Sequence, residues 1–333
     1  MNPGLGSGVL GHKRQLESID RALSSGKVPH AYLFSGIGGI GKRLVAMKLA
    51  QALQCLSGKD RPCGVCKGCV KAGEGSHPDV IIIEPEGNFI KIEQVRELQK
   101  RLSYRPFEGK ATVCIIEGAD KFNLSSGNAL LKTLEEPPSG AYLILLAENT
   151  RHVIRTIISR CQRLKFSLLS SDDISEILLK EKGISRDDAL SVAFVAEGSP
   201  GKAIKFLDNF PLEDKEKFLN ALVSFNGIDE VFSLAEELTG KENVERLTHM
   251  LEILKLFLRD IVLLKLGIGD DRLANIFNKK AAEKESQMYS LVALFDMAEM
   301  VSGTEAAILM NVNKRLAIEN LLLNYYNKRA GKC

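Results

Sequence analysis

Residues 36–43 contain most of a phosphate-binding loop, and the one residue that does not fit limits the chemistry available. The full motif is Gly, any four residues, Gly-Lys and then Ser or Thr; Gly36, Gly41 and Lys42 fit, but position 43 is Arg. In an active loop the hydroxyl at that last position holds Mg²⁺ against the nucleotide phosphates. Arg43 has no acceptor lone pair and a fixed positive charge, so it cannot ligate a cation. We therefore expect a nucleotide-binding fold that has lost hydrolysis.

Four cysteines form a second candidate site. Cys55, Cys63, Cys66 and Cys69 are separated by seven, two and two residues, with Gly and Pro among them. A Cys-x2-Cys pair brings two thiolates to one tetrahedral Zn²⁺, and four thiolates close the coordination shell. The alternatives are a redox pair or four unconnected buried thiols, but this Gly- and Lys-rich segment offers little to bury them. We expect a structural zinc site; His77 is an alternative ligand, but its position favours a loop residue.

A strand and a helix must hold the phosphate loop. Residues 31–34 predict a short buried strand before it, and residues 42–53 predict a helix with regularly spaced apolar positions after it. Strand, Gly-rich turn and helix together direct backbone N–H groups and a helix N-terminus at an anion. Short motif matches also arise by chance, so a Gly-rich turn that binds nothing remains the alternative.

The surrounding sequence alternates apolar runs and helical patterns. This order predicts a parallel sheet with helices on both faces. Strands are expected at residues 79–84, 112–117 and 142–146, and helices near 92–102 and 126–134. The strands stop after about Lys165, and helices are expected at 173–182, 186–196 and from Pro200, followed by longer ones, of which 244–266 and 306–326 have the clearest periodicity.

Composition sets the broad class of protein. The chain has 333 residues, of which 45% are hydrophobic and 26% charged, with a net charge of +3, which is too small to indicate a nucleic-acid surface by itself. No apolar run approaches the roughly 18 residues of a membrane helix, and the first residues contain no hydrophobic signal segment. We expect a soluble, cytoplasmic protein whose seven cysteines are metal ligands or buried thiols rather than disulfides.

Two further runs carry a resemblance to a known family. Residues 128–138 read Asn-Ala-Leu-Leu-Lys-Thr-Leu-Glu-Glu-Pro-Pro, and residues 159–161 read Ser-Arg-Cys. Together with His-Ala-Tyr-Leu-Phe at 30–34, the four-cysteine segment and the terminal helices, they make the whole chain similar to the clamp-loader branch of the AAA+ ATPases. Within that branch it resembles the delta-prime pattern of bacterial DNA polymerase III.

The resemblance implies a domain organisation. It implies an α/β P-loop (AAA+) domain with a parallel sheet, then a small helical lid domain, then an all-α collar domain for oligomerisation. The expected bounds are 1–166 with the zinc module inserted at 55–69, then 167–210, then 211–333.

The resemblance also assigns roles to individual residues. Glu117 matches the acidic end of the Walker B strand, but Gly118 stands where active members have the carboxylate that polarises water. Asn149 matches the sensor position, and Gly201 stands where the lid helix of a motor has an Arg, with Lys202 next to it. Arg160, in Ser-Arg-Cys, matches an arginine finger that acts on the neighbouring subunit's ATP; a surface Arg capping a helix is the alternative.

These roles together imply a non-motor subunit, or stator, of the replicative clamp loader. The expected partners are the gamma/tau and delta subunits and, through the complex, the sliding clamp and primer–template DNA. No intrinsic ATPase is expected, ATP binding is doubtful, and polymerase activity belongs to the DNA polymerase III holoenzyme. Two alternatives remain: a weakly active motor of the gamma/tau type, and a stand-alone zinc protein that binds DNA, which the near-neutral charge disfavours.

Overall fold

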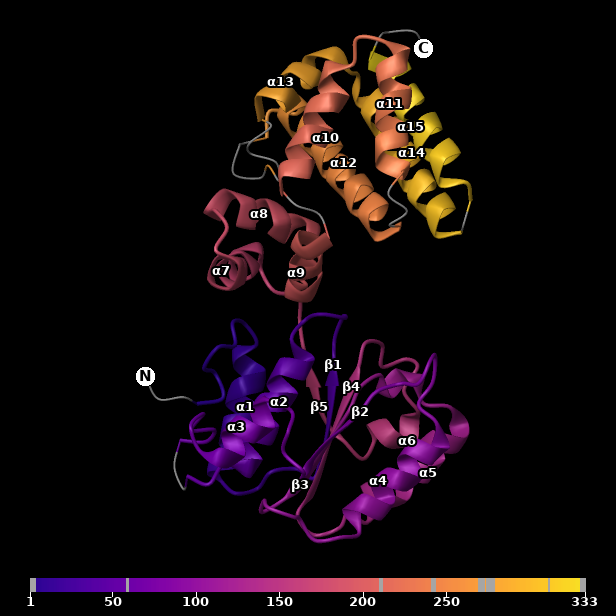
Figure 1. Cartoon of the computed structure of the whole chain (residues 1–333). Helices are drawn as coiled ribbons and strands as arrows, with labels where there is room; N and C mark the ends of the chain where they lie inside the picture. The colour runs from indigo at the N-terminus through magenta and orange to yellow at the C-terminus, as the bar shows by residue number, and fades with distance from the viewer. Residues whose placement is uncertain are drawn as a thin grey trace. The chain divides into compact units, whose positions relative to one another are not determined.

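The computed structural model describes residues 4–57, 60–209, 212–240, 244–268, 273, 279–310 and 312–329. The chain divides into two compact units, Met1–Asp173 and Ile174–Cys333 (Figure 1). The first unit holds the sheet, and the second is helical throughout its described part. The expected division into three domains, at residues 166 and 210, stays a prediction.

The first unit is built on a five-stranded sheet, which is parallel as the sequence predicted and contains the four predicted strands and one more. The strand order is β2-β3-β4-β1-β5. The strands are β1 (Ala31–Ser35), β2 (Val80–Ile83), β3 (Thr112–Ile116), β4 (Ala141–Ala147) and β5 (Gln162–Lys165). β5 was not predicted, because Leu164 is its one buried residue, so its sequence lacks the apolar run of the other four strands.

Helices cover both faces of this sheet (Figure 1). α1 (Lys13–Ser24), α2 (Lys42–Gln54) and α3 (Lys67–Gly73) lie on one side, and α4 (Ile92–Leu102), α5 (Leu124–Glu135) and α6 (Arg155–Ile158) on the other. On the second side, Leu98 of α4 and Leu130 of α5 pack with Leu143 of β4 in one buried core. α1 went unpredicted although its buried residues, Leu16, Ile19 and Leu23, have helical spacing.

The parallel register brings the carboxyl ends of β2, β3, β4 and β1 to one edge of the sheet. Ile83 pairs with Ile116, Ile116 with Leu145, and Ser35 with Ala147. The residues that follow these strands therefore meet at this edge, which is where ligands bind in open α/β sheets.

The second unit consists of helices packed around α12. Leu254, Phe257 and Leu258 of α12 are fully or almost fully buried. α12 contacts the short helices α8 and α9 as well as α10, α13 and α14. The helices are α7 (Ser171–Lys182), α8 (Arg186–Val195), α9 (Pro200–Asn209), α10 (Leu212–Ser224), α11 (Ile228–Thr239), α12 (Val244–Lys265), α13 (Lys279–Met288), α14 (Leu291–Leu309) and α15 (Lys314–Arg329).

The predicted helix over residues 306–326 is wrong, because the chain breaks there between α14 and α15. α14 ends at Leu309 and α15 begins at Lys314. The Asn313 side chain accepts a hydrogen bond from the Leu316 N–H at 3.2 Å, which is a helix N-cap. None of the described helices is both long enough and apolar enough to cross a membrane.

Candidate functional site

The phosphate loop opens onto a cavity of about 360 Å³ at the carboxyl edge of the sheet. Four of the predicted residues line it: Gly41, Lys42, Arg43 and Glu117. Gly36 and Asn149 are not among the described residues that line this cavity. Gly38, Gly39, Pro85, Gly118, Asp120, Lys121, Leu146, Ala147 and Glu148 complete its walls.

Lys42 is turned toward the loop's own backbone. Its Nζ donates hydrogen bonds to the carbonyl oxygens of Gly36, at 2.6 Å, and Ile37, at 2.8 Å, and the residue is only 8% exposed. Burial lowers the pKa of Lys42, against the opposing pull of the Glu148 and Asp120 carboxylates. The ammonium group would have to leave these carbonyls to reach a phosphate.

Arg43 lies between two carboxylates at the ends of neighbouring strands. Its Nη1 donates a hydrogen bond to Glu84 Oε1 at 2.8 Å and also lies 2.6 Å from Glu117 Oε1. The second contact is an ion pair without hydrogen-bond alignment, which leaves Glu117 Oε1 without a hydrogen-bond partner. Burial raises the pKa of Glu117; the Arg43 charge acts against this, while Glu84 adds to it. The guanidinium therefore places a positive charge beside both carboxylates.

The residue after Glu117 has no space for a side chain. Gly118 has φ +65°, a left-handed conformation that L side chains rarely adopt. A Cβ at this position would lie 2.8 Å from Pro85 Cγ. A catalytic carboxylate here would require the β2–α4 connection to move.

Asn149 makes a local contact. Its Oδ1 accepts the N–H of Arg151 at 3.0 Å, and its own N–H lies 3.3 Å from Asp120 Oδ2. The exposed amide therefore stabilises the turn after β4. A sensor role for Asn149 stays a prediction. The fixed position of this turn depends on Asp120, which also accepts the Glu148 N–H at 3.3 Å.

Arg160 is held in place by acceptors from two segments. Its Nη1 donates to Thr156 O at 3.0 Å and to Ser159 Oγ at 3.3 Å. Its Nη2 donates to Glu135 Oε1 at 2.5 Å. The side chain remains 34% exposed. Arg160 therefore makes the helix-end contact expected of a capping residue. Its guanidinium is also accessible to solvent, as a finger requires.

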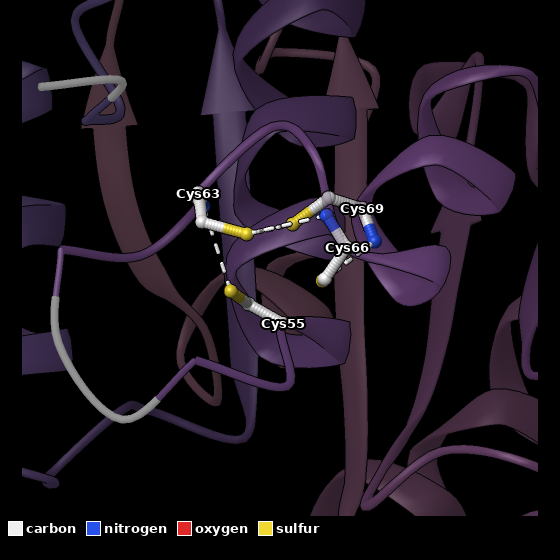
Figure 2. Close-up of side chains that lie close together, drawn as sticks. All are labelled: Cys55, Cys63, Cys66 and Cys69. Carbon is white, nitrogen blue, oxygen red and sulfur yellow. Dashed lines mark hydrogen bonds between the residues drawn. The ribbon is translucent and has the colours of Figure 1, made fainter.

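The four cysteines converge in space as their spacing predicted (Figure 2). Cys55 follows α2, and Cys69 lies on α3, whose N-cap is Cys66. All four Sγ atoms lie within 4.8 Å of one another, and those of Cys63 and Cys69 are 3.9 Å apart. Sulfur atoms bound to one tetrahedral Zn²⁺ at about 2.3 Å would be about 3.8 Å apart, so the cluster needs little adjustment.

Backbone N–H groups point at these sulfur atoms. The Sγ of Cys66 accepts from the N–H groups of Leu56 and Cys69, each at 3.4 Å, and Cys63 Sγ accepts from the Cys66 N–H at 3.4 Å. The N–H groups of Val65 and Cys66 lower the pKa of the Cys63 thiol. Donors of this kind favour the thiolate form, which is the form that binds a metal. The donor set fits a closed metal site.

Sequence reasoning missed three side chains that matter here: Glu84, Asp120 and Glu135. Glu84 gave a usable signal, since an acidic residue directly after a buried strand lies at the carboxyl edge. Glu135 gave none beyond its place in the run at 128–138, because its partner Arg160 is 25 residues away.

Comparison with known proteins places the chain in a family. A family described as "DNA polymerase III, delta subunit" matches residues 11–170, and one described as "DNA polymerase III, delta subunit, C terminal" matches residues 211–326. The chain belongs to the family of DNA polymerase III subunits that includes delta-prime, gamma and tau.

Individual relatives in this family are moderately similar. The delta-prime subunit of Bacillus subtilis is 35% identical over 168 residues, which is 50% of this chain and 51% of the relative. The tau subunit of Escherichia coli is 36% identical over 206 residues, 60% of this chain and 32% of the relative. The chain thus spans about half or less of the length of these two curated relatives.

A solved structure supports the fold of this family member. The gamma subunit-related protein of Thermotoga maritima aligns with a TM-score of 0.51 and 17% identity, over 95% of this chain and 99% of that one. The AAA+ architecture predicted from the sequence is confirmed. Delta-prime and tau match about equally well, so the choice between stator and motor depends on the loop chemistry.

Proposed function

We propose that this chain is a non-motor subunit of the bacterial replicative clamp loader. It would assemble with gamma/tau and delta subunits in the cytoplasm and help them load the sliding clamp on primer–template DNA. The observation that carries the proposal is Arg43, whose guanidinium contacts Glu84 and Glu117 where a motor would hold Mg²⁺.

Two neighbouring positions argue against hydrolysis by this chain. A divalent ion at the loop would have to share the space beside Glu117 with a fixed positive charge. No carboxylate is available at position 118, and the close approach of Pro85 to any Cβ there disfavours adding one. The gamma/tau-type motor is the second candidate because those subunits are relatives, and Mg²⁺-dependent turnover by the isolated chain would favour it.

Arg160 is the residue that would act on the neighbour. A guanidinium supplied in trans stabilises the charge that develops on the transferred phosphoryl group, worth roughly 10³–10⁵ in rate in analogous GTPases. The side chain is partly exposed and anchored at Nη1 and Nη2, which suits a group presented across a subunit interface.

We also propose that Cys55, Cys63, Cys66 and Cys69 bind one structural Zn²⁺. Four thiolates leave no open coordination position, so the metal would contribute to folding rather than to catalysis. The site would tie the end of α2 to α3. A stand-alone DNA-binding role for this module would require tight DNA binding by the isolated chain.

The test is an Arg160→Ala variant in the reconstituted clamp loader, with primed DNA and clamp present. We expect assembly by gel filtration to be unchanged and turnover at the adjacent site to fall by at least about 10²-fold. Since other motor sites still fire, the clamp-loading rate is measured as well. The matched control is Arg163→Ala, an exposed Arg three residues away that makes no ion pair with any described residue. Unchanged loading and turnover with Arg160→Ala would refute the finger role.

A further inference from the structure

The contact between Glu135 and Arg160 joins the two runs that carried the family resemblance. Glu135 ends α5, and Arg160 follows α6. Glu135 Oε1 accepts from Arg160 Nη2 at 2.5 Å. The two residues are 25 positions apart, so the contact depends on how α5 and α6 pack in the folded unit.

Glu135 lies at the carboxyl end of α5, where a negative charge needs a positive partner. A carboxylate in the last turn of a helix faces the negative end of the helix dipole, which is unfavourable. The Arg160 guanidinium compensates for this, and it also donates to Thr156 O in the last turn of α6. Arg160 thus bridges the last residue of α5 and a backbone carbonyl of α6.

This arrangement fixes the direction of the guanidinium. Nη1 has two acceptors, Thr156 O and Ser159 Oγ, and Nη2 has Glu135. Among the described residues, no acceptor meets Nε, so part of the donor fork remains free. The Arg160 and Glu135 side chains are too exposed, at 34% and 50%, for the ion pair to contribute much to stability. Its effect is to restrict the rotamers of a long side chain.

We propose that Glu135 is a positioning residue for the arginine finger: its carboxylate holds Arg160 so that the free edge of the guanidinium faces the neighbouring subunit's nucleotide. The inference rests on the proposed function of Arg160. Pre-organisation of this kind lowers the entropic cost of reaching the transition state, and small misplacements of a catalytic group carry large rate penalties. Glu135 therefore acts through Arg160 and contacts no phosphate itself.

The experiment compares Glu135→Ala and Glu135→Gln in the reconstituted complex. With Glu135→Ala we expect kcat for ATP at the adjacent site to fall about tenfold, with KM changed less than about twofold, because a finger acts in the transition state. Glu135→Gln keeps an oxygen that can accept from Nη2, so it should retain most of the activity. The matched control, Glu136→Ala, removes the adjacent exposed carboxylate, for which the described residues show no ion pair.

A double-mutant cycle separates positioning from a general structural effect. In an Arg160→Ala background, Glu135→Ala should cause no further loss, because both changes remove the same interaction. If Arg160→Ala lowers kcat but Glu135→Ala matches wild type, the positioning role fails and the proposed function stands. If Arg160→Ala itself has no effect, the proposed function fails. A rise in kcat with Glu135→Ala would mean that the carboxylate competes with phosphate for the guanidinium, and would overturn the inference.

Discussion

Replacing Arg43 tests whether an internal cation excludes Mg²⁺ from the loop. Arg43→Thr restores the hydroxyl that the loop motif requires and leaves Glu84 and Glu117 without their shared positive partner. We expect the wild-type chain to bind nucleotide no better with Mg²⁺ than without it. Arg43→Thr should gain Mg²⁺-dependent binding.

The repulsion between the Arg43 guanidinium and Mg²⁺ can be calculated from their separation and the exposure of the side chain. Unit charges 4 Å apart interact by about 4 kcal/mol at an effective dielectric of 20, so a divalent ion beside the guanidinium would be repelled by roughly 8 kcal/mol. The Arg43 side chain is 52% exposed, and solvent screening reduces this to a few kcal/mol. Since about 1.4 kcal/mol is a factor of ten, the repulsion still weakens Mg²⁺ binding roughly a hundredfold or more.

The assay is isothermal titration calorimetry of the isolated chain with a non-hydrolysable ATP analogue, with and without Mg²⁺. The Arg43→Thr variant should bind the analogue at least about tenfold more tightly with Mg²⁺ than without it. This factor is smaller than the roughly hundredfold effect calculated for the repulsion. Arg43→Lys is the matched control, because it keeps the charge and should behave like wild type. An equal Mg²⁺ enhancement in wild type and Arg43→Thr would refute the reasoning.

Two further predictions concern stability. Removing the metal with a strong chelator, or changing Cys63 to Ser, should lower the Tm of the first unit. Metal analysis of the intact chain should find one Zn²⁺. An unchanged Tm with no bound metal would contradict the zinc site. Asp79 accepts the N–H groups of residues 107–109 at 2.6–2.8 Å, and these bonds hold its pKa below the usual 3.8 although burial acts to raise it. Its contribution is therefore full above about pH 4 and lost as the pH falls through the lower folded-state pKa, so Asp79→Asn should cost about 1–3 kcal/mol in urea unfolding at pH 6 and less at pH 3. An equal cost at both pH values would contradict this assignment.

Most of the fold could be predicted because its strands are continuous apolar runs. β2 and β3 are buried on both faces and read unambiguously, and α4 was predicted with its observed bounds, Ile92–Leu102. β5 could not be found in this way, since it contributes a single buried side chain and its backbone pairing with β1 leaves no trace in sequence. The break after Leu309 was missed because apolar residues continue through it at helical spacing.

The candidate sites differ in the same way: features local in the sequence could be predicted, and contacts between distant residues could not. The cysteine cluster lies within fifteen residues of chain, so its spacing alone predicted that the thiols converge. The departure from the loop motif at Arg43 can be read from the sequence, but its partner Glu84 cannot, because Glu84 is 41 residues away and lies close only through the strand order β2-β3-β4-β1. Long-range pairs of this kind depend on strand register, which a single sequence does not specify.

The proposed function requires that the chain lack hydrolysis of its own and still assist a neighbour, and these two properties depend on separate sets of contacts. The residues at positions 43 and 118 both act at the ends of β2 and β3, where the Arg43 guanidinium held by Glu84 opposes Mg²⁺ binding and Pro85 leaves no room for a carboxylate at position 118. Arg160 instead depends on α5 and α6, and none of its described hydrogen-bond partners lines the loop cavity. Because the two sets of contacts share no residue, substitutions around the loop leave the contacts of Arg160 intact, as the proposed non-motor subunit requires.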